Sequence, residues 1–179
     1  MMHRKLLLNA LEQYQKSLHI TADEQQMAHR IIEFVQTNPH CFERDNYGHI
    51  TGSVWIVHPY EAKVLLTHHK KLNRWLQLGG HADGDSNIAQ VALKEALEES
   101  GIPQFTFITD TIFDIDVHPM PNKCAYHYDV RFVLKAITDV IQISDESNDV
   151  AWFDIDRVAQ HTQEPSILRM NKKYQEWFK

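Results

Sequence analysis

A single amphipathic helix inside a strand-rich centre is the feature that most constrains the fold of this chain. Residues 87–100 predict this helix, because apolar residues recur along one side and a glycine at 101 suits its C-terminal cap. Segments rich in β-branched and aromatic residues lie on both sides of it. They predict strands at residues 49–58, 63–68, 73–78, 105–117, 126–136 and 149–153, with Gly79 and Gly80 ending the third. Together with a closing helix at 167–178, this order favours a layered α/β or α+β domain.

The first forty residues predict two helices that precede the strands. Apolar residues recur at helical spacing in both, and Thr21 followed by Glu24 is a capping-box signature at the start of the second helix. We therefore expect a helical N-terminal extension over residues 1–46. A single domain with a C-terminal helix is expected over residues 47–179.

Composition excludes several classes of protein. The chain has 179 residues, of which 43% are hydrophobic and 23% charged, and this predicts one globular domain with a sizeable core. Its formal net charge of −6 disfavours binding to a nucleic-acid polymer, which requires a basic face.

No apolar run approaches the roughly 18 residues of a membrane span, and the leucines at 6–8 are too few for a signal peptide. Because Cys41 and Cys124 form no disulfide framework, we expect a cytoplasmic protein without membrane partners.

Three glutamates on the central helix are candidates for metal binding. Glu95, Glu98 and Glu99 lie at positions i, i+3 and i+4, where side chains are neighbours with Cβ atoms about 5–6 Å apart. Their like charges repel, and the helix macrodipole disfavours anions near the C-terminus. A divalent cation would make this arrangement favourable, since hard cations take carboxylate oxygens. The alternative is an ordinary solvated acidic face, because glutamate is a good helix former.

The glutamates belong to a longer motif that includes the turn before the helix. Its positions, at fixed spacing, are Gly80, Glu95, Ala96, Glu98, Glu99, Gly101 and Ile102. This pattern resembles the signature of the Nudix hydrolase family, Gly-x5-Glu-x7-Arg-Glu-U-x-Glu-Glu-x-Gly-U, where U is aliphatic. Two positions differ: Ser86 stands in place of the first glutamate and Lys94 in place of the arginine, a pair that braces the loop in the family. Since lysine lacks the bidentate fork of arginine, we expect a weaker brace here, from Asp83 or Asp85 to Lys94.

The resemblance implies a Nudix-type α/β/α sandwich with a mixed β-sheet and a metal-dependent hydrolase activity. In such an enzyme, a water activated near Mg²⁺ or Mn²⁺ attacks a phosphorus atom of a diphosphate. By family matching, Glu98 and Glu99 are expected as metal ligands, and Glu95 as a further ligand or as the base that orients the water. The Gly80 carbonyl is expected to complete the metal shell. Glu146 is expected as an auxiliary ligand or base, with a solvated polar turn as the alternative.

Five further residues are expected to contact the substrate: Arg74, His81, Asp83, His127 and Asp129. Arg74 precedes the glycines and is expected to meet substrate phosphates. His81 and Asp83 follow the glycines directly, so these two side chains are expected near the metal. Alternation along residues 126–132 places His127, Asp129 and Arg131 on one face of a strand. This polar row either lines a pocket or is paired internally. The 12 histidines show no zinc-binding spacing, which disfavours a structural zinc site.

The expected function is hydrolysis of a phosphoanhydride bond in a nucleoside diphosphate linked to another moiety, or in a related organic diphosphate. The expected partner is this small phosphorylated molecule, and the helical extension either covers the sheet or forms a homodimer contact. The changes at Ser86 and Lys94 favour one alternative, a non-catalytic Nudix-like module that binds a nucleotide or a protein. A second alternative is an isomerase of the isopentenyl-diphosphate type, which shares a Gly-Gly-His turn. That isomerase needs a reactive cysteine, and Cys41 and Cys124 lack its cysteine-rich motif.

Overall fold

The computed structural model describes residues 2–44, 47–120, 124–142 and 147–178. Its α-helices are α1 (Lys5–Gln15), α2 (Ala22–Thr37), α3 (Ile88–Ser100) and α4 (Pro165–Phe178), and short 3-10 helices span Met2–Arg4 and Ile155–Gln160. Its strands are β1 (His49–Val57), β2 (Lys63–His69), β3 (Arg74–Leu76), β4 (Leu78–His81), β5 (Phe105–Phe107), β6 (Asp114–Met120), β7 (Cys124–Ala136) and β8 (Ser147–Asp154). Every helix among these residues is too short or too polar to cross a membrane.

The strands pair in one sheet, in which hydrogen-bonded neighbours follow the order β3-β2-β1-β7-β5. In addition, β4 pairs with β1, β6 with β7, and β8 with β2. The β1–β2 hairpin predicted from the sequence is present and antiparallel, with Ile56 opposite Leu65. The pairs β2–β3, β2–β8, β5–β7 and β6–β7 are antiparallel as well.

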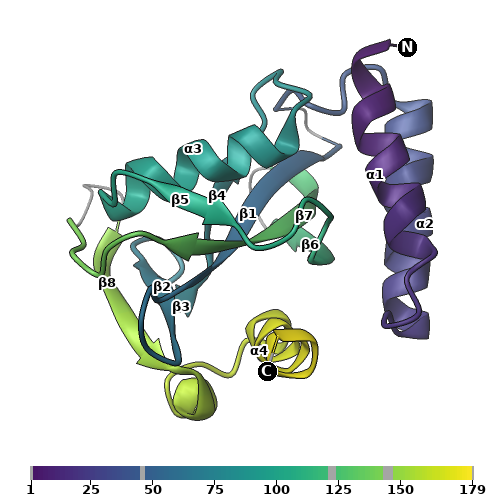
Figure 1. Ribbon diagram of the computed structural model, residues 1–179. Helices are drawn as coiled ribbons and strands as arrows, with labels where there is room; N and C mark the ends of the chain where they lie inside the picture. Colours follow the sequence, from purple (N-terminus) through teal and green to yellow (C-terminus); the bar gives the residue numbers. More distant parts are fainter. Residues whose placement is uncertain (1, 45–46, 121–123, 143–146, 179) are drawn as a thin grey trace. The chain divides into compact units, whose positions relative to one another are not determined.

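Two compact units make up the chain. The first comprises Met1–Ser53, Gly79–Ala92 and Thr109–Phe132, and the second comprises Val54–Leu78, Leu93–Ile108 and Val133–Lys179. Within the first unit, α1 and α2 lie side by side (Figure 1), and α2 contacts β6. Phe34 of α2 stacks on Tyr128 of β7, with ring centroids 3.9 Å apart. The capping box predicted at Thr21 and Glu24 is confirmed at the start of α2.

Within the second unit, β8 runs along β2 and places aromatic side chains against β3. Phe153 of β8 and Trp75 of β3 meet edge to face, with ring centroids 4.7 Å apart. Helix α4 packs by its apolar stripe, of which Ile167 and Met170 are fully buried. The Asn171 side chain in the same helix donates a hydrogen bond of 3.0 Å to the Ile155 carbonyl, which ties α4 to the preceding 3-10 helix.

Two predictions about the strands are wrong. Residues 105–117 form β5 and β6 with irregular backbone between them, because Thr109 accepts a local hydrogen bond from the Thr111 backbone N–H (3.2 Å) in place of a ladder bond. Gly79 and Gly80 do not end a strand but lie inside β4. Gly79 has a φ of +155°, and a Cβ atom there would overlap Ser53, so only glycine lets β4 approach β1 this closely.

Candidate functional site

Helix α3 carries its three glutamates in its C-terminal half, beyond most of its apolar stripe. The stripe is buried and consists of Ile88, Val91, Ala92 and Ala96. Glu98 is exposed, whereas Glu95 and Glu99 are half-buried. At about 100° per residue, Glu95 and Glu99 continue the line of this stripe toward the C-terminal end of the helix, and all three carboxylates keep some access to ions and solvent.

Lys94 lies one turn before Glu98 on the same helix. Its Nζ is 3.7 Å from Glu98 Oε1, and the two side chains are 68% and 58% exposed. An exposed pair of this kind contributes at most about 1 kcal/mol, because water and salt screen it. Lys94 therefore neutralises little of the negative charge that the glutamates create.

Arg44 holds the loop that follows β4, a role that the sequence had suggested for Lys94. Its Nε and Nη2 donate bidentate hydrogen bonds of 2.5 and 2.7 Å to the two carboxylate oxygens of Asp83. These hydrogen bonds hold the pKa of Asp83 below its ordinary value. Asp85 accepts a 2.8 Å hydrogen bond from the backbone N–H of Asn87. Arg44 could not be found from sequence spacing, because it lies 39 residues from Asp83.

The polar row on β7 is internally paired at Asp129 and Arg131. Asp129 is 1% exposed, and one of its oxygens accepts 2.8 Å hydrogen bonds from the hydroxyls of Thr51 and Ser53. Its other oxygen accepts a 2.7 Å hydrogen bond from Arg131 Nε. Burial acts to raise the pKa of Asp129, but the Arg131 guanidinium and these hydrogen bonds outweigh burial and lower it. Whether Asp129 also contributes to substrate binding stays a prediction.

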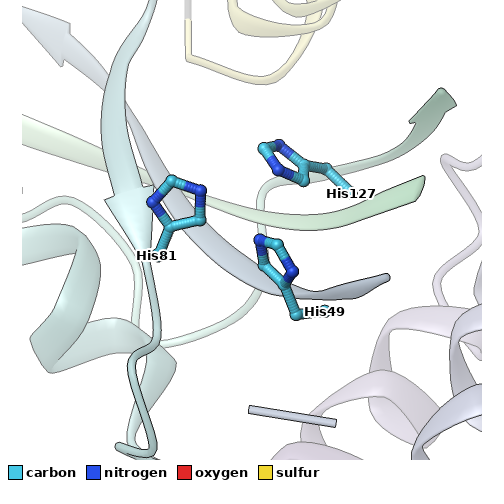
Figure 2. A group of neighbouring side chains, drawn as sticks. All are labelled: His49, His81 and His127. Atoms are coloured by element: carbon cyan, nitrogen blue, oxygen red, sulfur yellow. The ribbon is translucent and has the colours of Figure 1, made fainter. Parts of the chain in front are cut away.

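Three histidines from three strands point toward one another in the first unit (Figure 2). His49 begins β1, His81 ends β4, and His127 lies in β7. The ring centroids are 4.9 Å apart for His49 and His81, 4.7 Å for His49 and His127, and 5.2 Å for His81 and His127. Burial, and then the neighbouring histidines, lower the pKa of His127 to about 3, so its ring is neutral at physiological pH.

The structure thus brings together two of the predicted site residues, His81 and His127, and adds His49. The sequence did not single out His49, since nothing in the spacing of the three histidines reveals which strands pair. Arg74 is exposed and donates a 2.8 Å hydrogen bond to Glu164. Glu146 lies outside the described residues.

Comparisons with known proteins agree with the motif on α3. The family model for the NUDIX domain matches residues 49–174. No curated protein matches the chain. A NUDIX-family hydrolase from Clostridium perfringens is similar in structure, with 23% identity over 72% of this chain and 97% of that one and a TM-score of 0.59.

Two further solved structures share the fold. An Ap4A hydrolase from C. elegans has 18% identity, covers 72% of this chain and 96% of its own, and gives a TM-score of 0.63. The NUDIX domain of Shewanella oneidensis NrtR, solved with ADP-ribose, has 17% identity, covers 82% and 97%, and gives a TM-score of 0.59. These likenesses confirm the predicted α/β fold with a mixed sheet.

Proposed function

The chain belongs to the NUDIX domain family and is a Nudix hydrolase, and from that premise we propose that it hydrolyses a phosphoanhydride bond with the help of Mg²⁺ or Mn²⁺. The proposed substrates are nucleoside diphosphates linked to another group, or related organic diphosphates. The observation that carries the proposal is the grouping of Glu95, Glu98 and Glu99 as helical neighbours in α3, where none of the three side chains is fully buried. The similar structures solved as an Ap4A hydrolase and as a complex with ADP-ribose support this class of substrate.

The donor atoms on α3 suit a hard divalent cation. Carboxylate oxygens are the ligands that Mg²⁺ and Mn²⁺ prefer. Three carboxylates within one turn of a helix repel one another, and the exposed Lys94 offsets this repulsion only weakly. When bound, such an ion neutralises phosphate oxygens and lowers the pKa of a coordinated water.

The residues of this chain have separate roles in the proposed reaction. In the proposal, Glu98 and Glu99 hold the ion, together with the backbone carbonyl of Gly80. Glu95 is a further ligand or accepts the proton that the attacking water loses. The water oxygen forms a bond to phosphorus, the bridging P–O bond breaks, and its electron pair leaves with the second phosphate. Glu146 stays a proposed auxiliary ligand or base.

The proposed substrate-side residues differ in how freely they can respond to a ligand. Arg74 is 60% exposed, so its ion pair with Glu164 is weak. A substrate phosphate could replace Glu164 as the partner of Arg74 at little cost in free energy. Asp83 and Asp129 already hold arginine side chains, so in the proposal they position the loop after β4 and the strand β7. His81 and His127 remain as residues that contact the substrate.

The variant Glu98→Gln tests the proposal, since it removes a charged ligand and keeps the size of the side chain. Purified protein is assayed with Mg²⁺ and with Mn²⁺ against nucleotide sugars, dinucleoside polyphosphates, ADP-ribose, NADH, CoA and nucleoside triphosphates, and released phosphate or monophosphate is measured. We expect at least about a hundredfold loss of turnover, because even outer-shell partners of a metal contribute about 10–100-fold.

The matched control is Glu176→Gln in α4. Glu176 pairs with Lys172 at 3.8 Å and is 58% exposed, as Glu98 is, so it reproduces the surroundings of Glu98 on a helix without the other glutamates. We expect full activity from this variant. Turnover retained in Glu98→Gln contradicts the assignment of the metal ligands. If wild type binds nucleotides tightly but turns over no member of the panel, the chain is the binding module suggested by Ser86 and Lys94.

A further inference from the structure

We propose that His49, His81 and His127 together bind a divalent transition-metal ion of the zinc class. This site uses nitrogen ligands from β1, β4 and β7, and none of the carboxylates of α3. It goes beyond the proposed hydrolase function and does not rest on the metal site of α3, although it shares His81 and His127 with the residues proposed to contact the substrate.

The ligand atoms already lie close to the geometry that one ion requires. One nitrogen from each ring can be chosen so that all three are within 4.8 Å of one another. Since a zinc–nitrogen bond is about 2.1 Å, two nitrogens bonded to one tetrahedral zinc ion lie about 3.4 Å apart. Rotations of the imidazole rings would have to close this difference, and Figure 2 shows the three rings as near neighbours.

Close approaches between strands place these histidines side by side. Gly48, which precedes His49, has a φ of +128°, and a Cβ atom there would lie 2.6 Å from the Tyr126 carbonyl oxygen. Glycine therefore lets the start of β1 reach β7 next to His127. On the other side, the backbone N–H of Ala82 donates a 3.3 Å hydrogen bond to the Ile50 carbonyl, which joins the end of β4 to the start of β1.

The chemistry of the cluster selects the class of metal. Imidazole nitrogen suits Zn²⁺, Co²⁺, Ni²⁺ and Cu²⁺, whereas Mg²⁺, Mn²⁺ and Ca²⁺ prefer oxygen. The neighbouring carboxylates are engaged elsewhere: both oxygens of Asp83 accept hydrogen bonds from Arg44, and those of Asp129 accept from Thr51, Ser53 and Arg131. In the proposal, the ion is therefore coordinated by one imidazole nitrogen from each of the three histidines.

The three residues differ in burial. His49 is 3% exposed, whereas His81 and His127 are half-buried, so the cluster keeps some access to solvent through these two side chains. Three protein ligands leave at least one position of a tetrahedral zinc ion for an exchangeable ligand such as water. The site therefore has the composition of an open zinc centre rather than a closed structural one.

Metal titrations of the full chain test this site. Zn²⁺ binding is measured by calorimetry and Co²⁺ binding by visible absorption, which reports the ligand field directly. We expect one ion bound per chain through the histidines, and at least tenfold weaker binding in His81→Gln and in His127→Gln. The exposed His40, which pairs with Glu43, supplies the control His40→Gln, and this variant should bind as wild type does.

A variant with Glu95, Glu98 and Glu99 all changed to Gln separates the two metal sites. It should lose Mg²⁺-dependent turnover and keep the Co²⁺ spectrum. The inference is overturned if wild type binds no Co²⁺, if that triple variant loses the spectrum, or if the folded His81→Gln and His127→Gln variants bind within twofold of wild type. Should those histidine variants fail to fold, X-ray absorption of zinc-loaded wild type decides: three imidazole ligands support the site, and an oxygen-only shell contradicts it.

Discussion

At the scale of single residues, Arg131 carries a positive charge buried among carboxylates. Its side chain is 1% exposed and lies 2.7 Å from Asp129, 3.1 Å from Asp114 and 3.4 Å from Asp116. Removing one partner of a buried ion pair costs about 3–5 kcal/mol, because the remaining charges lose their compensation in a medium of low polarity. Arg131 is thus a stability determinant of the first unit, although the sequence placed it only in a polar row.

We expect the variant Arg131→Leu to lose about 3–5 kcal/mol of unfolding free energy, measured by urea denaturation. The control is Arg157→Leu, since Arg157 is 67% exposed and 3.9 Å from Asp154. An exposed pair of this kind is worth at most about 1 kcal/mol. Equal losses in the two variants would show that the buried carboxylates are satisfied without Arg131.

At the scale of secondary-structure elements, the start of α2 is fixed by reciprocal hydrogen bonds. The Thr21 hydroxyl oxygen accepts a 3.2 Å bond from the Glu24 backbone N–H, and Glu24 accepts a 2.8 Å bond from the Thr21 backbone N–H. Glu24 also accepts a 2.8 Å bond from the Tyr14 hydroxyl in α1, so the cap joins the two helices.

Replacing the cap, Thr21→Ala, should lower the unfolding free energy by about 1 kcal/mol. Thr37 at the other end of α2 supplies the control, because its hydroxyl donates to the Glu33 carbonyl of its own helix and caps no helix start. Thr37→Ala should change the stability by less than about 0.5 kcal/mol. A smaller effect of Thr21→Ala than of Thr37→Ala in thermal or urea unfolding would contradict the role of the cap.

The elements that the sequence predicted correctly are those set by local chemistry. The capping box of α2, the amphipathic stripe of α3 and the β1–β2 hairpin all depend on residues close together in the chain. The spacing that groups the glutamates of α3 is local as well. The histidine cluster was not foreseen, because it depends on which strands pair and in which register. The extent of β4 could not be predicted for the same reason, because Gly79 approaches Ser53 closely in space although the two are far apart in the sequence.

At the scale of the whole molecule, the helical extension forms part of the core of the first unit. Leu11, Ile31 and Val35 of its helices are fully buried. After α2, the Cys41 carbonyl accepts a 2.8 Å hydrogen bond from the Ile50 backbone N–H, which ties the extension to β1. Removing the extension would expose this apolar surface, at a cost of roughly 25 cal/mol per Å². A chain cut at the predicted boundary between residues 46 and 47 would therefore lack the side chains that pack against one side of the first unit.

We expect a chain that begins at residue 47 to lose cooperative thermal unfolding, or to unfold at least about 10 °C lower than the full chain, because 1 kcal/mol shifts the midpoint by about 2–4 °C for a protein of this size. Two point variants measure how much single side chains of the extension contribute to this stability. Phe34→Ala removes the ring that stacks on Tyr128 and should give a measurable part of the loss, whereas Leu18→Ala, at a side chain that is 95% exposed, should give none. If the shortened chain unfolds at the temperature of the full chain, the two helices are a separate appendage and do not contribute to this core. Since the NUDIX match covers residues 49–174, that outcome would also place the folding unit in the part of the chain that contains the match.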